Sequence, residues 1–353
     1  FCAAISWPGE VVRLALSKVG SFIIEALRIC PKSRKIAYAL ITISAERKIQ
    51  NYVHLNIIYI VFPTAKKGTW PVTKNGTIVM PELPEVETVK LALIPALQNR
   101  LVLSAFVGRK NLRWPLPKDL ANRLINRRFL YLNRRGKYLL MHLDSEQVLL
   151  LHLGMSGSVR IYQQKPEIGK HDHFMLEMAP QNSCDGYTYV VLNDPRRFGW
   201  IDLFAESTMS THKLLANMGP EPLANDFSAT QLEAAFKGRS GSVKNALLNQ
   251  TLIAGIGNIY ASEALFLAGI SPRRKAGNIF GARADRLAAA IVKILRAAID
   301  DGGTSLRDHV QPGGEIGYFT QRLAVYGQPG KPCPKCRTPI KTIIQSGRSS
   351  FYC

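Results

Sequence analysis

A proline and a glutamate follow Met80 at the start of an amphipathic run. Inside a chain, Pro81 is inert because its nitrogen belongs to an amide. If Met80 were the initiator and were removed, Pro81 would present a secondary amine, and a terminal amine has a pKa of about 7.7–8.0. Such an amine is partly neutral near neutral pH and forms an iminium, while Glu82 can shuttle protons. The pair predicts covalent amine catalysis, with a simple helix start as the alternative.

Three of the six cysteines have spacing typical of a metal site: Cys333 and Cys336 form a Cys-x2-Cys pair, and Cys353 follows. This spacing fits the first three ligands of a zinc ribbon, whose fourth cysteine is expected three residues further on. The sequence therefore predicts one structural Zn2+ in a ribbon, residues 332–353, that lacks its fourth cysteine. Three unrelated cysteines are the alternative.

Arg196, Arg197 and Phe198 stand in a row within a turn-like segment. Guanidinium groups suit phosphate contacts and an aromatic ring can enter a base stack, so the segment favours nucleic-acid contact, with a solvated turn as the alternative. Met155, in a glycine-flanked loop, is either a wedge or part of a hairpin. His171, in the segment KHDHF, is interpreted as a phosphate contact rather than a metal ligand.

Gly255 and Gly257 precede Asn258 at the start of a predicted helix, where free N–H groups would form a phosphate seat. A Rossmann interpretation fails, because no strand precedes these glycines and no acidic residue follows about twenty residues later. Basic residues upstream, among them Arg239 and Lys244, favour a nucleic-acid clamp of two helices around tight turns.

The overall charge is strongly basic. The 353 residues carry a net charge of +21, of which +8 falls in residues 1–79, and the pI is near 9.9. A polyanion is therefore the first partner to consider, and a merely basic protein is the alternative. No apolar run approaches the roughly 20 residues that a membrane-spanning helix needs. The few scattered cysteines indicate a reducing compartment.

Hydrophobic patterning predicts an α+β protein of several domains. A helix from Pro84 and a series of short strands favour a β-sandwich over residues 80–209. Helices are expected over residues 210–310, the last of them strongly amphipathic and stopped by glycine. A Gly-rich linker with a short strand at 322–327 occupies residues 311–331. The sandwich strands are expected within 101–108, 128–143, 147–154, 157–163, 171–178, 187–194 and 199–205.

Residues 1–79 contain no motif, and only 55–62 is expected to form a buried strand. We interpret the segment as upstream sequence read in frame, with a true extension as the alternative, because its pattern is inconsistent with that of residues 80–353.

Eight segments resemble, in order, the formamidopyrimidine-DNA glycosylase family (Fpg/MutM): MPELPEVE, RRGKYLL, HLGMSG, KHDH, DPRRFG, GIGNIYASE, GYFTQRLAVYG and GRSSFYC. The resemblance covers residues 80–353 and none of residues 1–79. It implies an N-terminal β-sandwich with a flanking helix, a helix–two-turns–helix domain and a C-terminal zinc ribbon. It also implies a bacterial, cytoplasmic and nucleoid-associated monomer whose partner is double-stranded DNA containing oxidised bases.

The activity implied by the resemblance has two parts: removal of oxidised purines such as 8-oxoguanine and formamidopyrimidines, then β,δ-elimination at the abasic site. Pro81 matches the nucleophile that attacks the sugar C1′ and forms a Schiff base, with Glu82 as the proton donor. Lys137 matches the lysine assigned to β-elimination, and Arg348 the arginine assigned to δ-elimination. This activity requires that the mature chain begin at Pro81.

The resemblance also implies a DNA interface. Met155, Arg196 and Phe198 match the side chains that fill the gap left by a flipped nucleotide, because the base must leave the stack for its glycosidic bond to be reached. Residues 311–320 match a loop that covers the extruded base. The remaining predicted contacts are His171, Arg239 and Asn258, by alignment, and Arg197 and Lys244, by charge.

Three alternatives stay open. An endonuclease VIII-like glycosylase would share the fold and act on oxidised pyrimidines. A non-catalytic damage-binding protein would keep the fold and bind DNA without cleaving it, as expected if Pro81 is not freed. A zinc-ribbon transcription factor is the weakest alternative, since it leaves the sandwich motifs unexplained.

Overall fold

The computed structural model describes residues 80–182, 185–304 and 319–353, together with five strands before residue 80. The chain divides into two units, Phe1–Gly76 and Thr77–Cys353. The first contains a two-stranded and a three-stranded sheet. The apolar run at 55–62 does contain a strand, but its predicted burial lies outside the described residues. The five strands are β1 (Cys2–Trp7), β2 (Glu10–Ala15), β3 (Phe22–Ile23), β4 (Tyr38–Ile43) and β5 (Ile57–Ile60).

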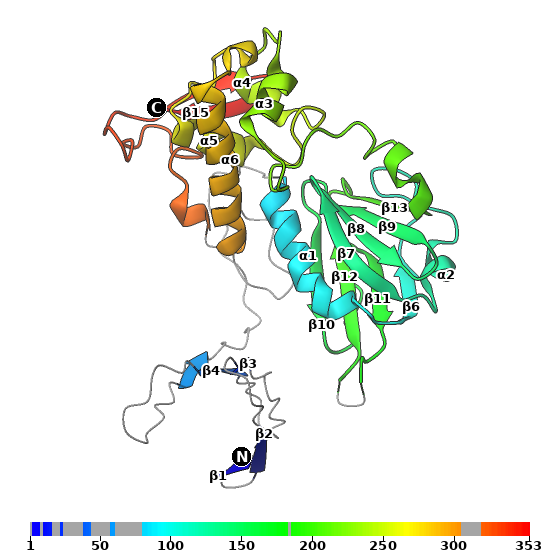
Figure 1. Ribbon diagram of the computed structural model, residues 1–353. Helices are drawn as coiled ribbons and strands as arrows, with labels where there is room; N and C mark the ends of the chain where they lie inside the picture. The colour runs from blue at the N-terminus through cyan, green and yellow to red at the C-terminus, as the bar shows by residue number, and fades with distance from the viewer. Residues whose placement is uncertain are drawn as a thin grey trace, which may run out of the picture. The chain divides into compact units, whose positions relative to one another are not determined.

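Two four-stranded antiparallel sheets form the first part of the second unit (Figure 1). One has the order β10-β12-β11-β6 and the other β13-β9-β8-β7. Every run predicted to hold a sandwich strand does so, which confirms this part of the predicted fold. The strands are β6 (Val102–Val107), β7 (Phe129–Arg135), β8 (Tyr138–Leu143), β9 (Gln147–His152), β10 (Ser158–Tyr162), β11 (Asp172–Met178), β12 (Thr188–Asn193) and β13 (Trp200–Ala205).

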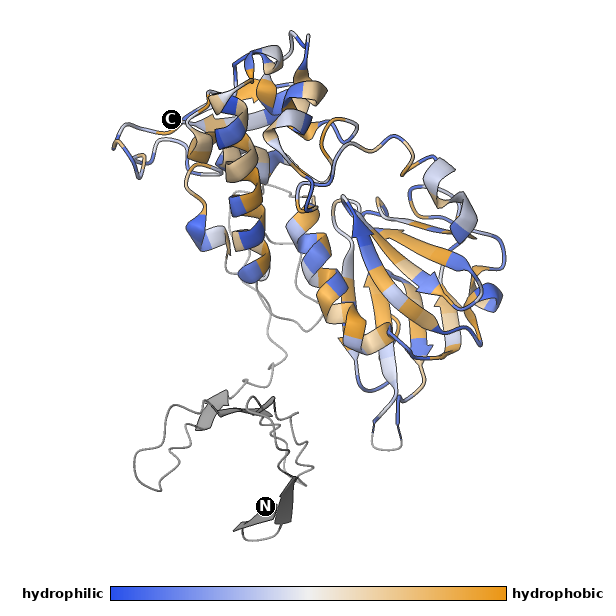
Figure 2. Cartoon of the chain, in the orientation of Figure 1, coloured by the Kyte–Doolittle hydropathy of each residue, from blue (hydrophilic) through white to orange (hydrophobic). Residues whose placement is uncertain are grey.

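Helix α1 (Leu83–Leu97) lies alongside the sandwich, and its first turn contains Pro84. Val86, Val89 and Leu93 recur at helical spacing and are buried in the same core as the inward side chains of both sheets. The strands are correspondingly apolar along most of their length (Figure 2). A short helix, α2 (Leu120–Leu124), follows β6.

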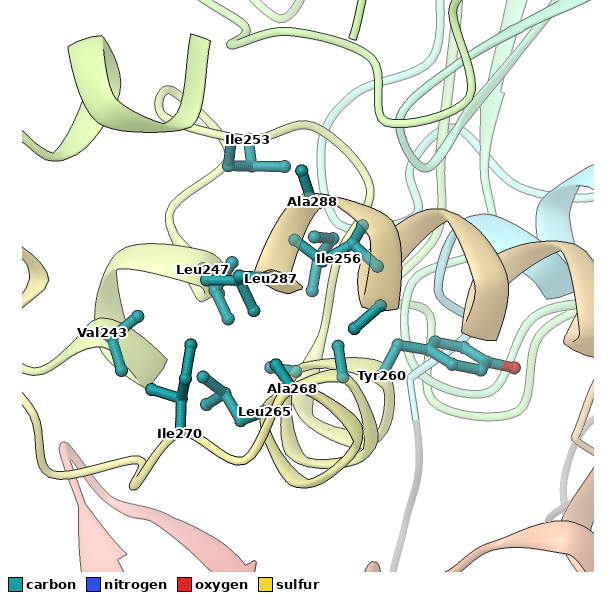
Figure 3. Close-up of a cluster of buried hydrophobic side chains, with 14 of the residues drawn as sticks. Val243, Leu247, Ile253, Ile256, Tyr260, Leu265, Ala268, Ile270, Leu287 and Ala288 are labelled. Carbon is teal, nitrogen blue, oxygen red and sulfur yellow. The ribbon is translucent and has the colours of Figure 1, made fainter. Parts of the chain in front are cut away.

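The second part of this unit is helical, as predicted. Its core gathers apolar side chains from four helices, and Leu247, Tyr260 and Leu287 represent three of them (Figure 3). The last helix is amphipathic because its buried residues recur on one face. The helices are α3 (Ala229–Phe236), α4 (Val243–Leu248), α5 (Asn258–Ala268) and α6 (Ala282–Asp300), with short 3-10 turns at η1 (Glu206–Thr211), η2 (Ala276–Asn278) and η3 (Phe319–Arg322).

A β-hairpin of β14 (Lys341–Gln345) and β15 (Arg348–Tyr352) completes the unit. The antiparallel register pairs Gln345 with Arg348 at the tip and Lys341 with Tyr352 at the base. Strand β15 packs against α5, which brings the ribbon to the helical domain (Figure 1).

The short strand predicted at 322–327 is wrong. This segment forms the end of η3 and a series of turns. The reason is the buried carboxylate of Glu263, which accepts hydrogen bonds from the N–H groups of Ala324, Val325 and Tyr326 at 2.8–2.9 Å. Those N–H groups are no longer available to a neighbouring strand. Most of the predicted lesion-covering loop, 311–320, lies outside the described residues.

Among the residues that the structure describes, no helix combines the length and the apolar character needed to cross a lipid bilayer.

Candidate active site and zinc centre

Glu82 is a buried carboxylate at the start of α1, with 2 % of its surface exposed. It accepts hydrogen bonds from the backbone N–H groups of Gly257 at 2.8 Å, Ile259 at 3.0 Å and Tyr260 at 3.4 Å, at the N-terminus of α5. A helix N-terminus favours an anion. Burial nevertheless raises the pKa of Glu82 to about 7, and Lys137 opposes this shift. The group can therefore hold or release a proton near neutral pH.

Two glycines make this contact possible. A Cβ on Gly257 would lie 2.2 Å from Cδ of Glu82, so a larger residue would displace the carboxylate. Gly255 has a φ of +80°, and its carbonyl accepts from the N–H of Leu83 at 3.1 Å. The predicted phosphate seat at these glycines is wrong, because the helix N–H groups already bind a carboxylate 175 residues earlier in the chain.

Glu85 is a second buried carboxylate, three residues after Glu82. Its Oε2 accepts from the N–H of Glu82 at 3.0 Å, and its Oε1 accepts from the hydroxyl of Tyr260 at 2.6 Å. Oε1 also accepts from the N–H and hydroxyl of Thr304, at 2.8 Å and 2.7 Å. Glu85 thus fixes the start of α1 against α5 and the segment after α6, and so fixes the backbone that carries Glu82.

Lys137 lies in the turn between β7 and β8, and only 5 % of its surface is exposed. Burial lowers the pKa of its ammonium group, while Glu82 and Glu85 raise it. A lysine with a lowered pKa has a larger neutral fraction, which can accept a proton. The structure therefore brings the predicted catalytic lysine close to the predicted catalytic glutamate.

An ion-pair network holds this turn. Arg134 donates from Nε to Glu87 Oε2 at 2.7 Å, and its Nη1 contacts Glu221. Arg135 donates to Glu221 Oε2 at 3.0 Å, and the N–H of Gly136 donates to the same oxygen at 2.9 Å. Because Glu221 lies between the sandwich and the helical domain, this connecting segment holds the turn that carries Lys137, the predicted catalytic lysine.

A pocket of about 580 Å³ brings most of the predicted catalytic residues together. Its wall is built from the start of α1, the β7–β8 turn, the end of β9, the start of α5 and the β14–β15 hairpin. Pro81 is itself buried, immediately after Met80. The lining residues are Met80, Glu82, Lys137, Tyr138, His152, Met155, Leu248, Gln250, Ile256, Gly257, Asn258, Tyr326, Gly347, Arg348, Ser349 and Phe351.

Five polar lining residues received no role from the sequence: Tyr138, His152, Gln250, Tyr326 and Ser349. The N–H of Gly154 donates to Nδ1 of His152 at 3.0 Å, so the neutral ring carries its proton on Nε2. Burial lowers the pKa of His152 to about 4, with smaller contributions from the positive charges of Lys137 and Arg113. His152 is thus a neutral hydrogen-bond donor. Its place in the segment HLGMSG was the only available signal.

The two loops that carry Met155 and Phe198 are bound together by Asp194, which has no exposed surface. Ser156 Oγ donates to Asp194 Oδ1 at 2.7 Å, and the N–H of Gly199 donates to Asp194 Oδ2 at 2.7 Å. Each hydrogen bond comes from the residue next to a predicted wedge side chain. One carboxylate therefore sets the spacing of both loops.

Arg196 lies over the ring of Phe198, with its guanidinium carbon 4.8 Å from the ring centre. Phe198 is 38 % exposed, and Arg197 is exposed with a φ of +57°. The turn therefore presents an aromatic ring and a cation to solvent. These residues, together with His171 and Arg239, do not line the pocket.

Lys244 behaves differently from the other predicted DNA contacts. It has no exposed surface, and its ammonium donates to the carbonyl of Ser349 at 2.8 Å and to Ser350 Oγ at 2.6 Å. It is directed into the protein and toward the hairpin, so in this structure it offers no surface for DNA to contact.

Cys333, Cys336 and Cys353 form a cluster whose sulfur atoms all lie within 4.8 Å of one another. Zinc–sulfur bonds of about 2.3 Å at tetrahedral angles place thiolates about 3.8 Å apart, so these sulfurs fit a zinc ion. Cys333 is buried, whereas Cys336 and Cys353 are exposed. The predicted zinc site is thus assembled by the fold.

Family models match three consecutive parts of the chain. These are the formamidopyrimidine-DNA glycosylase N-terminal domain at residues 80–201, the H2TH domain of the same enzymes at 218–310, and the zinc finger found in FPG and IleRS at 330–353. Together with the sandwich and the carboxylate–lysine pocket, they define a DNA-repair glycosylase with a zinc finger.

Curated relatives support the same family as the family models. A formamidopyrimidine-DNA glycosylase of Roseobacter denitrificans is 49 % identical over 284 residues, covering 78 % of this chain and 98 % of the relative. The corresponding protein of Ruegeria pomeroyi is 48 % identical over the same length and coverage. The chain belongs to the formamidopyrimidine-DNA glycosylase family.

Solved structures are similar too. The MutM (Fpg) protein of Thermus thermophilus matches with a TM-score of 0.68 at 35 % identity, covering 77 % of this chain and 97 % of that one. A complex of Lactococcus lactis Fpg with DNA containing an abasic site matches with a TM-score of 0.69 at 31 % identity, with the same coverage. A complex of a mutant of that protein with DNA containing Fapy-dG gives the same score and identity, covering 77 % and 98 %.

Proposed function

We propose that the protein, in a form that begins at Pro81, is a bifunctional glycosylase and abasic-site lyase acting on oxidised purines in double-stranded DNA. The observation that carries this proposal is the shared pocket of Glu82, Lys137 and Arg348 beside Pro81. The basic charge of the chain and the DNA complexes of the Lactococcus lactis relative support DNA as the partner. Such a role would place the protein with the bacterial chromosome in the cytoplasm.

The chemistry begins with a free amine on Pro81. The amine adds to C1′, the glycosidic bond breaks, and the damaged base leaves with a proton. Glu82, whose pKa is raised to about 7, supplies a proton when the sugar ring opens to the iminium. The positive iminium then acts as the electron sink for the eliminations.

Two eliminations follow. Lys137, whose pKa is lowered by burial, accepts a proton from C2′ while the C3′–O bond breaks and releases one DNA strand end as a phosphate. Loss of the C4′ proton and cleavage of the C5′–O bond then release the second phosphate. Arg348 lines the pocket and carries a permanent positive charge, which suits it to the departing phosphate of this second step.

For the DNA interface we propose Met155, Arg196 and Phe198 as the residues that fill the gap left by the extruded nucleotide. Their two loops are bound together by one buried carboxylate, and Phe198 is exposed. Inserting such side chains into a base step compensates for the lost stacking. His171, Arg197, Arg239 and Asn258 are proposed contacts to the DNA backbone.

A second candidate is favoured by the full 353-residue sequence. There the nitrogen of Pro81 is acylated by Met80 and cannot form a Schiff base. Such a chain would bind damaged DNA without cleaving it. This candidate and the enzyme share residues 81–353 and differ in whether residues 1–80 remain attached to the nitrogen of Pro81.

The decisive experiment is borohydride trapping on a duplex that contains 8-oxoguanine, using protein expressed from its native locus, followed by mass spectrometry. We expect a covalent adduct whose protein part begins at Pro81. DNA binding with an intact N-terminal segment and no adduct would support the damage-binding candidate instead. A parallel duplex with thymine glycol separates the purine enzyme from an endonuclease VIII-like one, since efficient excision of thymine glycol alone would contradict the proposed substrate.

A further inference from the structure

Lys244 is a buried cation that no carboxylate neutralises directly. None of the ion pairs among the described residues involves it. Burial is the main cause that lowers the pKa of its ammonium to about 8; Glu82 opposes this shift and Arg348 adds a smaller lowering effect that is already included in it. Burying a cation on uncharged acceptors is costly, so the two hydrogen bonds it makes are its main compensation.

Both of these hydrogen bonds go to the residues that directly follow Arg348. The ammonium donates to the carbonyl of Ser349 at 2.8 Å and to the hydroxyl of Ser350 at 2.6 Å. The hydroxyl of Ser350 in turn donates to Gln345 Oε1 at 2.6 Å, across the hairpin. Lys244 therefore holds both strands of the hairpin next to Arg348.

Two asparagines of the helical domain bind the same end of the hairpin. Asn258 Nδ2 donates to the carbonyl of Ser349 at 3.1 Å, and Asn245 Nδ2 donates to Ser346 Oγ at 2.8 Å. Lys244 and Asn245 lie on α4, and Asn258 begins α5. The helical domain thus holds the tip of the hairpin through hydrogen bonds from α4 and α5.

The cysteine cluster holds the opposite end. Cys353 directly follows Tyr352, which pairs with Lys341 at the base, four residue pairs from the Gln345–Arg348 pair at the tip. At about 3.4 Å per residue the two ends are roughly 14 Å apart. The metal site and the lysine therefore restrain different parts of the hairpin.

We propose that Lys244 is a positioning residue that fixes Arg348 at the pocket, and that it does so separately from the zinc site. The inference rests on the proposed function, in which Arg348 serves the second elimination. Removing the lysine should therefore impair the δ step selectively, while Schiff-base formation and the β step continue. Loss of the metal should first loosen the base of the hairpin.

The test compares Lys244→Met and Lys244→Arg with Lys293→Met, which removes an exposed lysine of α6. Residues 80–353 are suitable material, because curated relatives consist almost entirely of this part. With a duplex containing an abasic site, Lys244→Met should lower the ratio of δ- to β-elimination products about tenfold. Borohydride trapping should stay near the wild-type level, and Lys244→Arg should restore part of the ratio.

Several results would overturn the proposal: an unchanged product ratio in Lys244→Met, or an equal loss of trapping and of the ratio. Ser350→Ala, which removes one acceptor, gives a milder second variant and should shift the ratio in the same direction. If wild-type protein gives no adduct, the proposed function fails, and hydrogen exchange still tests the positioning role. Lys244→Met should speed amide exchange at 346–350, and zinc chelation should speed it mainly at 352–353; the reverse pattern contradicts the proposal.

Discussion

Gly257 and Glu82 are in direct contact, with the glycine N–H 2.8 Å from the carboxylate and no space for a side chain between them. Gly257→Ala should push the carboxylate out of place and reduce base excision about a hundredfold, since a small misplacement of a catalytic group is enough. Single-turnover excision measures this effect. Gly186→Ala is the control, because a Cβ there meets nothing within 4 Å. Equal rates in the two variants would show that the contact is not needed.

The raised pKa of Glu82 predicts how stability depends on pH. The folded protein retains this proton up to about pH 7, whereas the unfolded chain loses it near 4.5. The contribution of Glu82 to stability is thus full below 4.5 and is lost as the pH rises to about 7, by about 3 kcal/mol. Denaturant titrations at pH 5 and pH 8 should show a smaller decrease for Glu82→Gln than for wild type. The exposed Glu167→Gln should keep the wild-type slope, and a wild-type slope in Glu82→Gln would refute the shift.

The hydroxyl of Ser156 links the two proposed wedge loops, because it donates to Asp194 and accepts from the N–H of Arg196 at 3.2 Å. Ser156→Ala should reduce the unstacking of DNA next to the lesion about tenfold. The fluorescence of 2-aminopurine beside 8-oxoguanine reports this step without requiring strand cleavage. The exposed Ser210→Ala should behave like wild type. Wild-type unstacking in Ser156→Ala would show that the link between the two loops is not needed to unstack the DNA.

Zinc should be bound at one ion per chain and should be lost in Cys333→Ser. Because metal binding contributes directly to folding in sites of this kind, chelation should also lower the unfolding temperature. Elemental analysis and thermal unfolding measure the two effects. Thr342→Ala, on the exposed side of β14, should keep its zinc. A full zinc content in Cys333→Ser would mean that the cysteines are not the ligands.

Much of the fold could be predicted from the sequence because short-range patterns determine it. The strands of the sandwich alternate or run apolar over a few residues, and α6 repeats its buried residues at helical spacing. The zinc ligands could also be predicted, because all three cysteines lie close together in the sequence of the ribbon.

The predictions that were wrong share a different cause, which is contact between residues distant in sequence. The strand predicted at 322–327 lost its N–H groups to Glu263, about sixty residues earlier. The predicted phosphate seat was taken by Glu82, and Lys244 was buried by a hairpin about a hundred residues later. No local sequence pattern predicts these distant hydrogen-bond partners. The same is true of His152, whose tautomer depends on the fold of its own loop.

The pocket that contains Glu82 and Lys137 is shared among segments that are remote along the chain: the start of α1, the β7–β8 turn, the start of α5 and the tip of the last hairpin. None of these segments holds a complete set of reacting groups. On the proposed function, a half-folded chain therefore cannot break a DNA strand, because its nucleophile, proton carriers and phosphate-binding arginine have not yet met. Strand cleavage, a reaction that would harm the genome if it occurred outside repair, is therefore restricted to the fully folded protein.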